Sequence, residues 1–151
     1  MQTVISNSPE QTKTIGRILA RSLRTGRSIA LIGELGAGKT QFVKGFASGL
    51  GIHEDEVVSP SFGLINEYEG DTKLYHVDLY RLTSSEEIET LGLSDYIRGD
   101  GICVIEWADR LGDDLTLLDL IVYLEILPDG RRRLTLTGPD DSIPLKEIKT
   151  L

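Results

Sequence analysis

Four residues in the first third of the sequence have the types and spacing of a phosphate-binding loop. Gly33, Gly38, Lys39 and Thr40 match the pattern G-x-x-x-x-G-K-[ST]. Glycines let the backbone curl so that successive N–H groups point toward phosphate oxygens. The pattern therefore predicts a site for a nucleoside phosphate, with Lys39 on the β- and γ-phosphates and the Thr40 hydroxyl on Mg²⁺.

The sequence on either side of this loop predicts the elements that such a loop requires. An apolar run at 28–32 precedes it, and an amphipathic run with Phe42, Val43, Phe46 and Leu50 follows it. A strand, a glycine-rich turn and a helix in that order would place the positive end of the helix dipole at the phosphates. The alternative is a glycine-rich turn that binds nothing, and the flanking runs argue against it.

Composition and charge narrow the classes of function. The chain has 151 residues, 40% of them hydrophobic and 26% charged, which fits one globular domain over 1–151. A net charge of −8 argues against a free-standing nucleic-acid-binding protein, whose surface would be basic. The single cysteine, Cys103, is more typical of a buried strand residue than of a nucleophile. Without a signal peptide, a membrane-length apolar run or a disulfide framework, we expect a cytoplasmic protein that does not enter membranes.

The rest of the pattern predicts an α/β fold. Two hairpins are expected, one turning at 70–72 and one at 128–131, and the apolar run 101–106 is typical of a central parallel strand. Hairpins interrupt simple β–α alternation, so we predict a P-loop NTPase-like three-layer sandwich whose mixed central sheet includes antiparallel hairpins. The final residues are polar and are expected to be loose.

Two carboxylates close apolar strands and are candidates for the acidic half of a metal site. Asp78 follows the run 74–77, and Glu106 follows the run 102–105. Ligands of open α/β sheets bind at the carboxyl ends of the strands, where both residues fall. A phosphate loop also needs an acidic group to hold or orient Mg²⁺. Position alone leaves open which carboxylate contacts the metal and which positions water.

Other polar and aromatic residues have less specific patterns. His76 is more typical of a packed or hydrogen-bonded residue than of a catalytic one. Trp107 is equally compatible with a place over the site and with a place in the core. The segment 59–62 carries hydroxyls on a backbone restricted by proline and is a candidate responsive loop. The arginines at 131–133 are typical of a solvated hairpin edge, although one of them could stack on a nucleotide base.

The absence of two sequence features favours hydrolysis of ATP. Guanine-specific sites usually add an Asn-Lys-x-Asp motif, which this sequence lacks. Small-molecule kinases usually carry a mobile, arginine-rich lid, and no segment has that character. The remaining possibility is hydrolysis coupled to a conformational change, with 59–62 as the responding segment.

Four motifs in this order resemble the TsaE family, formerly called YjeE. They are the loop at 33–40, Ser-Pro-Ser-Phe at 59–62, Tyr-His-Val-Asp-Leu-Tyr-Arg at 75–81 and Ile-Glu-Trp at 105–107. Members of the TsaE family are bacterial ATPases required for making N6-threonylcarbamoyladenosine at position 37 of tRNAs. The resemblance implies partners, TsaB and TsaD. TsaD would carry out the transfer, this protein would reset the complex with ATP and Mg²⁺, and tRNA would be contacted only indirectly.

The resemblance also implies roles for individual residues. Lys39, Asp78 and Glu106 would be catalytic, Thr40 and Glu106 would hold Mg²⁺, and 9–12 would approach the adenine. Ser61 stands where the family usually has threonine and would keep a hydroxyl contact. The residues expected to bind the nucleotide are Glu34, Leu35, Gly36, Ala37, Gly38, Lys39, Thr40, Ser61 and Arg131. A non-hydrolytic ATP-dependent regulatory or scaffold subunit is the second hypothesis, and a small-molecule kinase is the third.

Overall fold

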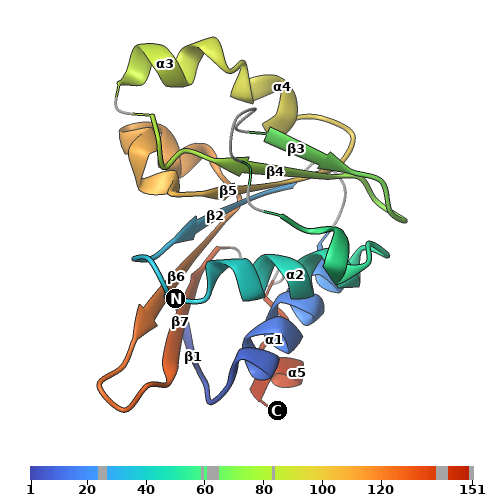
Figure 1. The fold of residues 1–151 in the computed structure, drawn as a ribbon, viewed down its shortest axis with the longest axis vertical. Coiled ribbons are helices and arrows are strands. Elements are labelled where there is room, and N and C mark those ends of the chain that lie inside the picture. Colours follow the sequence, from blue (N-terminus) through green and yellow to red (C-terminus); the bar gives the residue numbers. More distant parts are fainter. Residues whose placement is uncertain (24–26, 59, 61–64, 83, 139–142, 150–151) are drawn as a thin grey trace.

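A mixed sheet of seven strands runs through the protein in the order β1-β7-β6-β2-β5-β4-β3 (Figure 1). The computed structural model describes residues 1–23, 27–58, 60, 65–82, 84–138 and 143–149. Parallel pairing joins β2 to β5 and β6, and β4 to β5, whereas β1–β7, β6–β7 and β3–β4 are antiparallel. The strands are β1 (Gln2–Ser6), β2 (Ser28–Ile32), β3 (Ile65–Tyr68), β4 (Leu74–Asp78), β5 (Ile102–Glu106), β6 (Leu120–Ile126) and β7 (Arg132–Thr137).

This topology confirms the predicted mixed α/β sheet. Both expected hairpins are present, as β3–β4 and β6–β7. The apolar run that ends at Glu106 is β5, which lies between β2 and β4, pairs with both in parallel and is buried along its whole length. A strand covered on both faces has no polar side to present, which explains why its sequence does not alternate.

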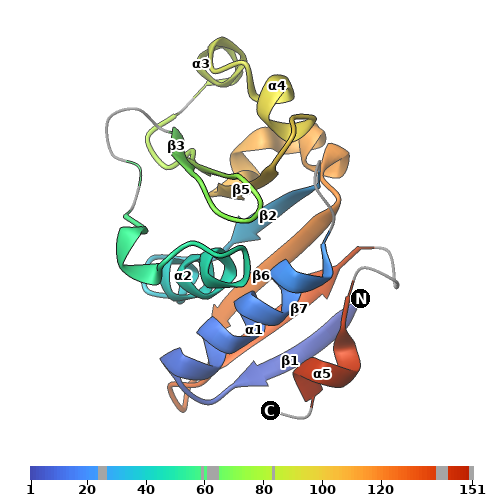
Figure 2. The same ribbon diagram turned by 90° about the vertical axis from the view of Figure 1, so that its right-hand side faces the viewer.

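Helices lie on both faces of the sheet (Figures 1 and 2). One face carries α1 (Pro9–Ser22) and α2 (Lys39–Gly49), and beyond them lies the short η1 (Glu54–Glu56). On the other side, α3 (Ser85–Thr90), α4 (Leu93–Ile97) and η2 (Ala108–Leu117) gather near the β4–β5 end of the sheet. None of the helices within the described residues is long and apolar enough to cross a membrane.

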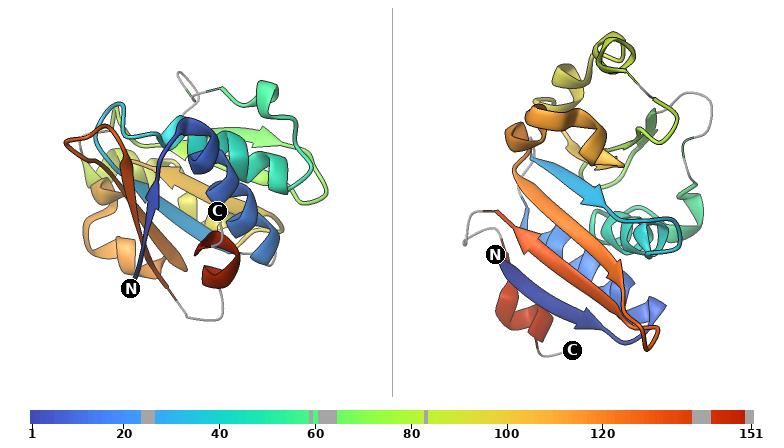
Figure 3. Two further views of the ribbon diagram at one scale, coloured as in Figure 1. Left: turned by 90° about the horizontal axis from the view of Figure 1, so that it is seen from below. Right: turned by 90° about the vertical axis from the view of Figure 1, so that its left-hand side faces the viewer.

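The C-terminal expectation was wrong, because a fifth α-helix, α5 (Leu145–Lys149), follows β7. It packs beside α1 and β1, as Figure 3 shows from below. Ile143 and Ile148 are 7% and 1% exposed and belong to the apolar cluster under α1. Ile143 and Ile148 stand among polar residues, so the local sequence gives only a weak signal for a packed helix. The surface against which they pack comes from segments far away in the chain.

Strand alternation divides the core into two apolar clusters, one on each face. In β2, Ile29 and Leu31 face the cluster that includes α1 and α2, whereas Ala30 faces the opposite cluster. In β5, Val104 faces the first cluster and Cys103 the second, and the cysteine is fully buried, as its apolar surroundings predict.

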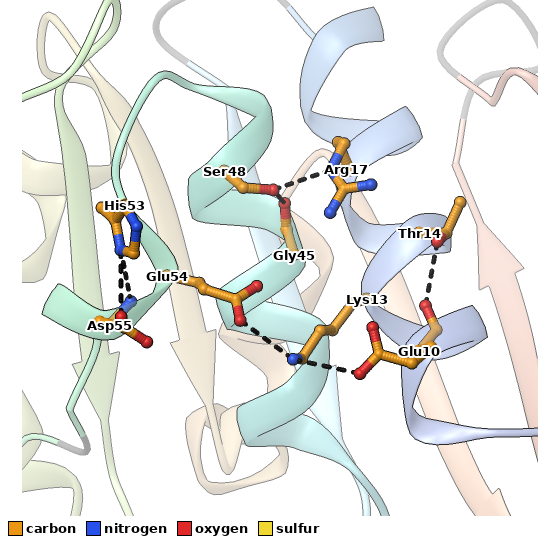
Figure 4. Close-up of polar contacts among 9 residues, drawn as sticks. All are labelled: Glu10, Lys13, Thr14, Arg17, Gly45, Ser48, His53, Glu54 and Asp55. Carbon is orange, nitrogen blue, oxygen red and sulfur yellow. Dashed lines mark hydrogen bonds and ion pairs between the residues drawn. The ribbon is translucent and has the colours of Figure 1, made fainter.

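The helices α1 and α2 pack at unusually close range because glycines lie between them. A Cβ atom added to Gly45 would lie 1.9 Å from the carbonyl oxygen of Lys13, and one added to Gly16 would lie 2.5 Å from that of Phe42. Polar contacts continue along the same side (Figure 4): Lys13 forms an ion pair with Glu54 of η1 at 3.1 Å. The two helices therefore form a closely fitted pair, whose N-terminal ends lie beside the loop after β2.

Candidate nucleotide site

The carboxyl ends of β2, β5 and β4 meet at one edge of the sheet. In the parallel register, Leu31 of β2 pairs with Glu106 of β5, and Glu106 pairs in turn with Asp78 of β4. The glycine-rich loop starts at Gly33, directly after β2, so it lies beside both carboxylates. The structure thus brings the predicted loop and both strand-ending carboxylates to the same edge.

The backbone of the loop depends on glycine at three places. Gly36 and Gly38 have φ angles of 82° and 104°, in the left-handed region that favours glycine. A Cβ atom on Gly33 would lie 2.8 Å from the carbonyl oxygen of Leu124. Gly38 caps α2, and its carbonyl accepts the N–H of Phe42 at 3.0 Å. The first N–H groups of α2, from Lys39 onward, have no acceptor within the helix and point toward its N-terminal end, where an anion can bind.

A cavity of about 550 Å³ lies next to this loop. Its volume is in the range of small-ligand sites. Four segments line it: the N-terminal segment with the start of α1, the loop with the start of α2, the ends of β4 and β5, and the β6–β7 turn. The residues are Ser6, Asn7, Ser8, Pro9, Thr12, Leu35, Gly36, Gly38, Lys39, Thr40, Gln41, Asp78, Tyr80, Glu106, Trp107, Gly130 and Arg132.

The amine of Lys39 is enclosed at the base of the loop. The residue is only 6% exposed, its Nζ donates a hydrogen bond to the Gly33 carbonyl, and it lies 3.6 Å from the centroid of the Trp107 ring. Burial lowers the pKa of Lys39, and the charges of Glu106 and Asp78 act in the opposite direction.

Trp107 lines the cavity and also packs against the second apolar cluster, so it combines the two places that its sequence position allowed. Its ring lines the cavity and packs against Tyr80, with the ring centroids 4.9 Å apart. Among the described residues other than glycine, Trp107 alone has a positive φ, 57°. Such a conformation costs of the order of 1–3 kcal/mol and persists where the surroundings enforce it, often at functional sites. The turn after Glu106 therefore presents this ring toward Lys39.

The two carboxylates have different surroundings. Glu106 is 4% exposed, and its Oε2 lies 2.5 Å from Nε2 of the equally buried His76, which confirms that this histidine is packed and hydrogen-bonded. Asp78 is half-buried, and its Oδ1 accepts the N–H of Tyr80 at 2.9 Å. Desolvation raises the pKa of Asp78, the Tyr80 N–H lowers it, and the charge of Glu106 raises it further.

These surroundings fit a cation that arrives with a nucleotide. Thr40, Asp78 and Glu106 all line the cavity, and the two carboxylates repel each other there. Across the described part of the chain, no three His, Cys, Asp or Glu side chains form a ready-made metal site. Mg²⁺ typically takes one or two protein ligands and completes its shell with phosphate oxygens and water, so this donor set suits Mg²⁺.

The structure places a different arginine at the cavity from the one that the resemblance implied. Arg131 is tied to Asp129, whose carboxylate accepts its backbone N–H at 3.0 Å and its Nε at 2.7 Å, and it does not line the cavity. Arg132 does line the cavity, and its Nη2 donates to the Gly36 carbonyl at 3.1 Å. The turn ends at Arg131 and β7 begins at Arg132, so the strand directs the second arginine toward the loop.

Other predicted nucleotide contacts also differ in their placement. Ala37 is fully buried beneath the loop, and its N–H donates to the Glu34 carbonyl, so neither residue lines the cavity with its side chain. Ser61, with most of the segment 59–62, lies outside the described residues. Sequence reasoning missed Tyr80, although its spacing of two from Asp78 was a signal that both could face one side. Pro9 and Thr12 line the cavity, and the approach of 9–12 to an adenine stays a prediction.

Comparisons with known proteins agree on one family. The family model described as "Threonylcarbamoyl adenosine biosynthesis protein TsaE" matches residues 6–134. The tRNA threonylcarbamoyladenosine biosynthesis protein TsaE of Treponema pallidum is 43% identical over 131 residues, which is 87% of this chain and 96% of that protein. Its namesake in Bacillus subtilis is 43% identical over 87% of this chain and 82% of its own length. The crystal structure of Bacillus subtilis YdiB matches with a TM-score of 0.76 and 33% identity, over 99% of this chain and 94% of that one.

Proposed function

The chain belongs to the TsaE family of threonylcarbamoyl adenosine biosynthesis proteins, and from this premise we propose that it is a Mg²⁺-dependent ATPase of that pathway. It forms a P-loop NTPase-like three-layer sandwich, a single domain over 1–151. It converts ATP to ADP and phosphate and thereby resets a TsaB–TsaD complex, which does the transfer chemistry on tRNA. One observation carries the proposal: Lys39, Thr40, Asp78 and Glu106 line one cavity of nucleotide size.

The phosphates bind at the loop and the first turn of α2. Backbone N–H groups there donate to phosphate oxygens, and the helix dipole adds a positive potential. Lys39 exchanges the Gly33 carbonyl and the Trp107 ring for the β- and γ-phosphates, a move supported by their proximity. Arg132, already in contact with the loop at Gly36, supplies a second cation.

Metal binding and activation of water are assigned to Thr40, Glu106 and Asp78. Thr40 and Glu106 would hold Mg²⁺, and a bound Mg²⁺ would supply charge neutralisation at the phosphates. Asp78, half-buried and with its pKa raised, orients the attacking water and accepts its proton. The adenine end of the nucleotide reaches the N-terminal wall, where the Ser6 and Thr12 hydroxyls are hydrogen-bonded to each other at 2.7 Å. The hydroxyl of Ser61 and the segment 59–62 respond to the γ-phosphate.

The charge of the protein supports a role beside a tRNA-binding partner rather than on tRNA itself. With 24 acidic and 16 basic residues, the chain has a net charge of −8, which opposes direct binding to phosphate backbones. TsaB and TsaD would therefore provide the contacts with tRNA, in the cytoplasm. ATP hydrolysis here would act through contact with those proteins.

Steady-state phosphate release, with and without purified TsaB and TsaD, tests the proposal. We expect Mg²⁺-dependent release that Asp78→Asn and Glu106→Gln reduce by at least about 100-fold. Asp113→Asn removes an exposed carboxylate of η2 and serves as the matched control, with activity within about twofold. No release in any mixture would refute the ATPase.

The same variants separate the competing hypotheses. If they bind ATP and fully support tRNA modification, the protein is a non-hydrolytic regulatory subunit. If they bind ATP and fail to support it, hydrolysis is required. Label from the γ-phosphate appearing in a metabolite instead of free phosphate would indicate a small-molecule kinase.

A further inference from the structure

The buried contact between His76 and Glu106 has no role in the chemistry described so far. His76 is 1% exposed and Glu106 is 4% exposed, and their side chains meet at 2.5 Å between Nε2 and Oε2. The surrounding positions on this face, such as Leu74 and Val104, belong to the apolar cluster under α1 and α2. An apolar side chain would suit such a position better than an imidazole, so the polar contact needs an explanation.

Sheet register produces this contact. His76 of β4 pairs with Val104 of β5, and Glu106 is two residues further along β5, so both side chains project from the same face. Asp78 is directly opposite Glu106. The histidine lies two residues further from the strand ends than the two carboxylates, and Glu106 lines the cavity whereas His76 does not.

The hydrogen bond uses one oxygen of the carboxylate. In the tautomer that donates Nε2–H to Glu106, Nδ1 carries no hydrogen, and Nδ1 has no hydrogen-bond partner among the described residues. This tautomer leaves no N–H group unpaired. Oε2 of Glu106 accepts this hydrogen bond, and Oε1 has no hydrogen-bond partner among the described residues.

We infer that His76 is a positioning residue that orients the Glu106 carboxylate so that its second oxygen is available to Mg²⁺. The inference rests on the proposed function, since it assigns a partner to the proposed metal ligand. Hydrogen bonds of this kind fix the geometry of metal-binding carboxylates, and their loss typically weakens metal binding by about 10- to 100-fold.

Substitutions at His76 can separate the hydrogen bond from simple packing. Glutamine places an amide N–H near the position of Nε2, asparagine places it short of Glu106, and leucine fills the space without a donor. Leu74→Ala is the matched control. Leu74 is fully buried on the same strand and the same face as His76, and its side chain cannot form a hydrogen bond with Glu106. Folding of each variant is checked by thermal unfolding.

Trp107 is the only tryptophan in the sequence and lines the cavity, so its fluorescence reports on the site directly. Nucleotide is titrated against each variant without Mg²⁺, and Mg²⁺ is then titrated against the ADP complex. We expect His76→Leu and His76→Asn to raise the Mg²⁺ concentration at half-saturation by at least about tenfold, and His76→Gln by less than about threefold. Affinity for ADP without Mg²⁺ should stay within about twofold in all variants, and Leu74→Ala should keep the Mg²⁺ requirement of the natural sequence.

Three results would overturn the inference: an unchanged Mg²⁺ requirement in His76→Asn, a glutamine variant no better than asparagine, or an equal change in Leu74→Ala. The comparison of asparagine with glutamine decides the matter even if the leucine variant does not fold. If the unsubstituted protein shows no response to Mg²⁺ in this titration, the proposed function is refuted, and the inference with it.

Discussion

Replacement of Gly45 by alanine should destabilise the protein, against the ordinary preference of helices. In an exposed helix interior, alanine is more stable than glycine by about 0.5–1 kcal/mol. At Gly45 of α2, however, the added Cβ would lie 1.9 Å from the Lys13 carbonyl oxygen of α1. That atom is backbone, so it cannot rotate away.

The structure sets the size of this effect. Cβ contacts shorter than 3.0 Å essentially do not occur, so the two helices must separate by at least the difference between 3.0 and 1.9 Å, about 1 Å. Overpacking of this kind costs about 1–3 kcal/mol, and the helix preference returns part of it, which leaves a net loss of roughly 1–2 kcal/mol. For a chain of this size, that lowers Tm by roughly 2–8 °C.

The same displacement should impair the site. Lys39 and Thr40 begin α2, while Pro9 and Thr12 of α1 line the opposite wall of the cavity, so separation of the helices widens it. A misplacement of about 1 Å can reduce catalysis by about 100-fold. We therefore expect weaker nucleotide binding or slower phosphate release in Gly45→Ala, measured alongside thermal unfolding.

Two further substitutions in α2 serve as controls. Lys44→Ala, next to Gly45, should leave Tm within about 2 °C because it adds no atom between the helices. Gly49→Ala should lower Tm by less than Gly45→Ala, since its Cβ would lie 2.7 Å from the Arg17 carbonyl. A rise in Tm for Gly45→Ala would refute the reasoning, because helix preference would then outweigh the close contact.

Three further predictions concern single side chains. Burial raises the pKa of the Cys103 thiol to about 12, so a thiol reagent should label the protein only after denaturation, as followed by absorbance. Desolvation raises the pKa of Asp78 above its ordinary value of 3.8, so the charged form lowers the stability of the folded protein at neutral pH. Asp78→Asn should therefore raise Tm at neutral pH. This increase in Tm should disappear as the pH falls below 3.8, where the carboxyl is protonated in both the folded and the unfolded protein. In ATP titrations, Arg132→Ala should weaken binding by about tenfold and Arg131→Ala by less than about twofold, because only Arg132 lines the cavity.

Local patterns predicted most of the sheet. The apolar run 28–32 is strand β2 with the same bounds. In both hairpins the two strands are joined by a turn that contains glycine and aspartate, with proline in the second. Such features depend on residues close together in the chain, so they can be read from the sequence.

Features that depend on distant segments could not be predicted in the same way. The sequence permitted any of three arginines at the cavity, and the boundary between turn and strand placed Arg132 there. The helix α5 forms where Ile148 can pack against the apolar cluster under α1. Both outcomes depend on partners more than 90 positions away in the chain, such as Gly36 for Arg132.

The sequence by itself determined that a glycine-rich loop with the phosphate-loop pattern follows β2 and that Asp78 and Glu106 end strands, because the type and spacing of neighbouring residues suffice for both. The tertiary structure alone decided their surroundings. It buries Glu106 against His76, leaves Asp78 half-buried beside the cavity and encloses the amine of Lys39 under Trp107. The physical reason is that hydrogen bonding and desolvation depend on which strands lie side by side, and the order β2-β5-β4 is not the order of the chain.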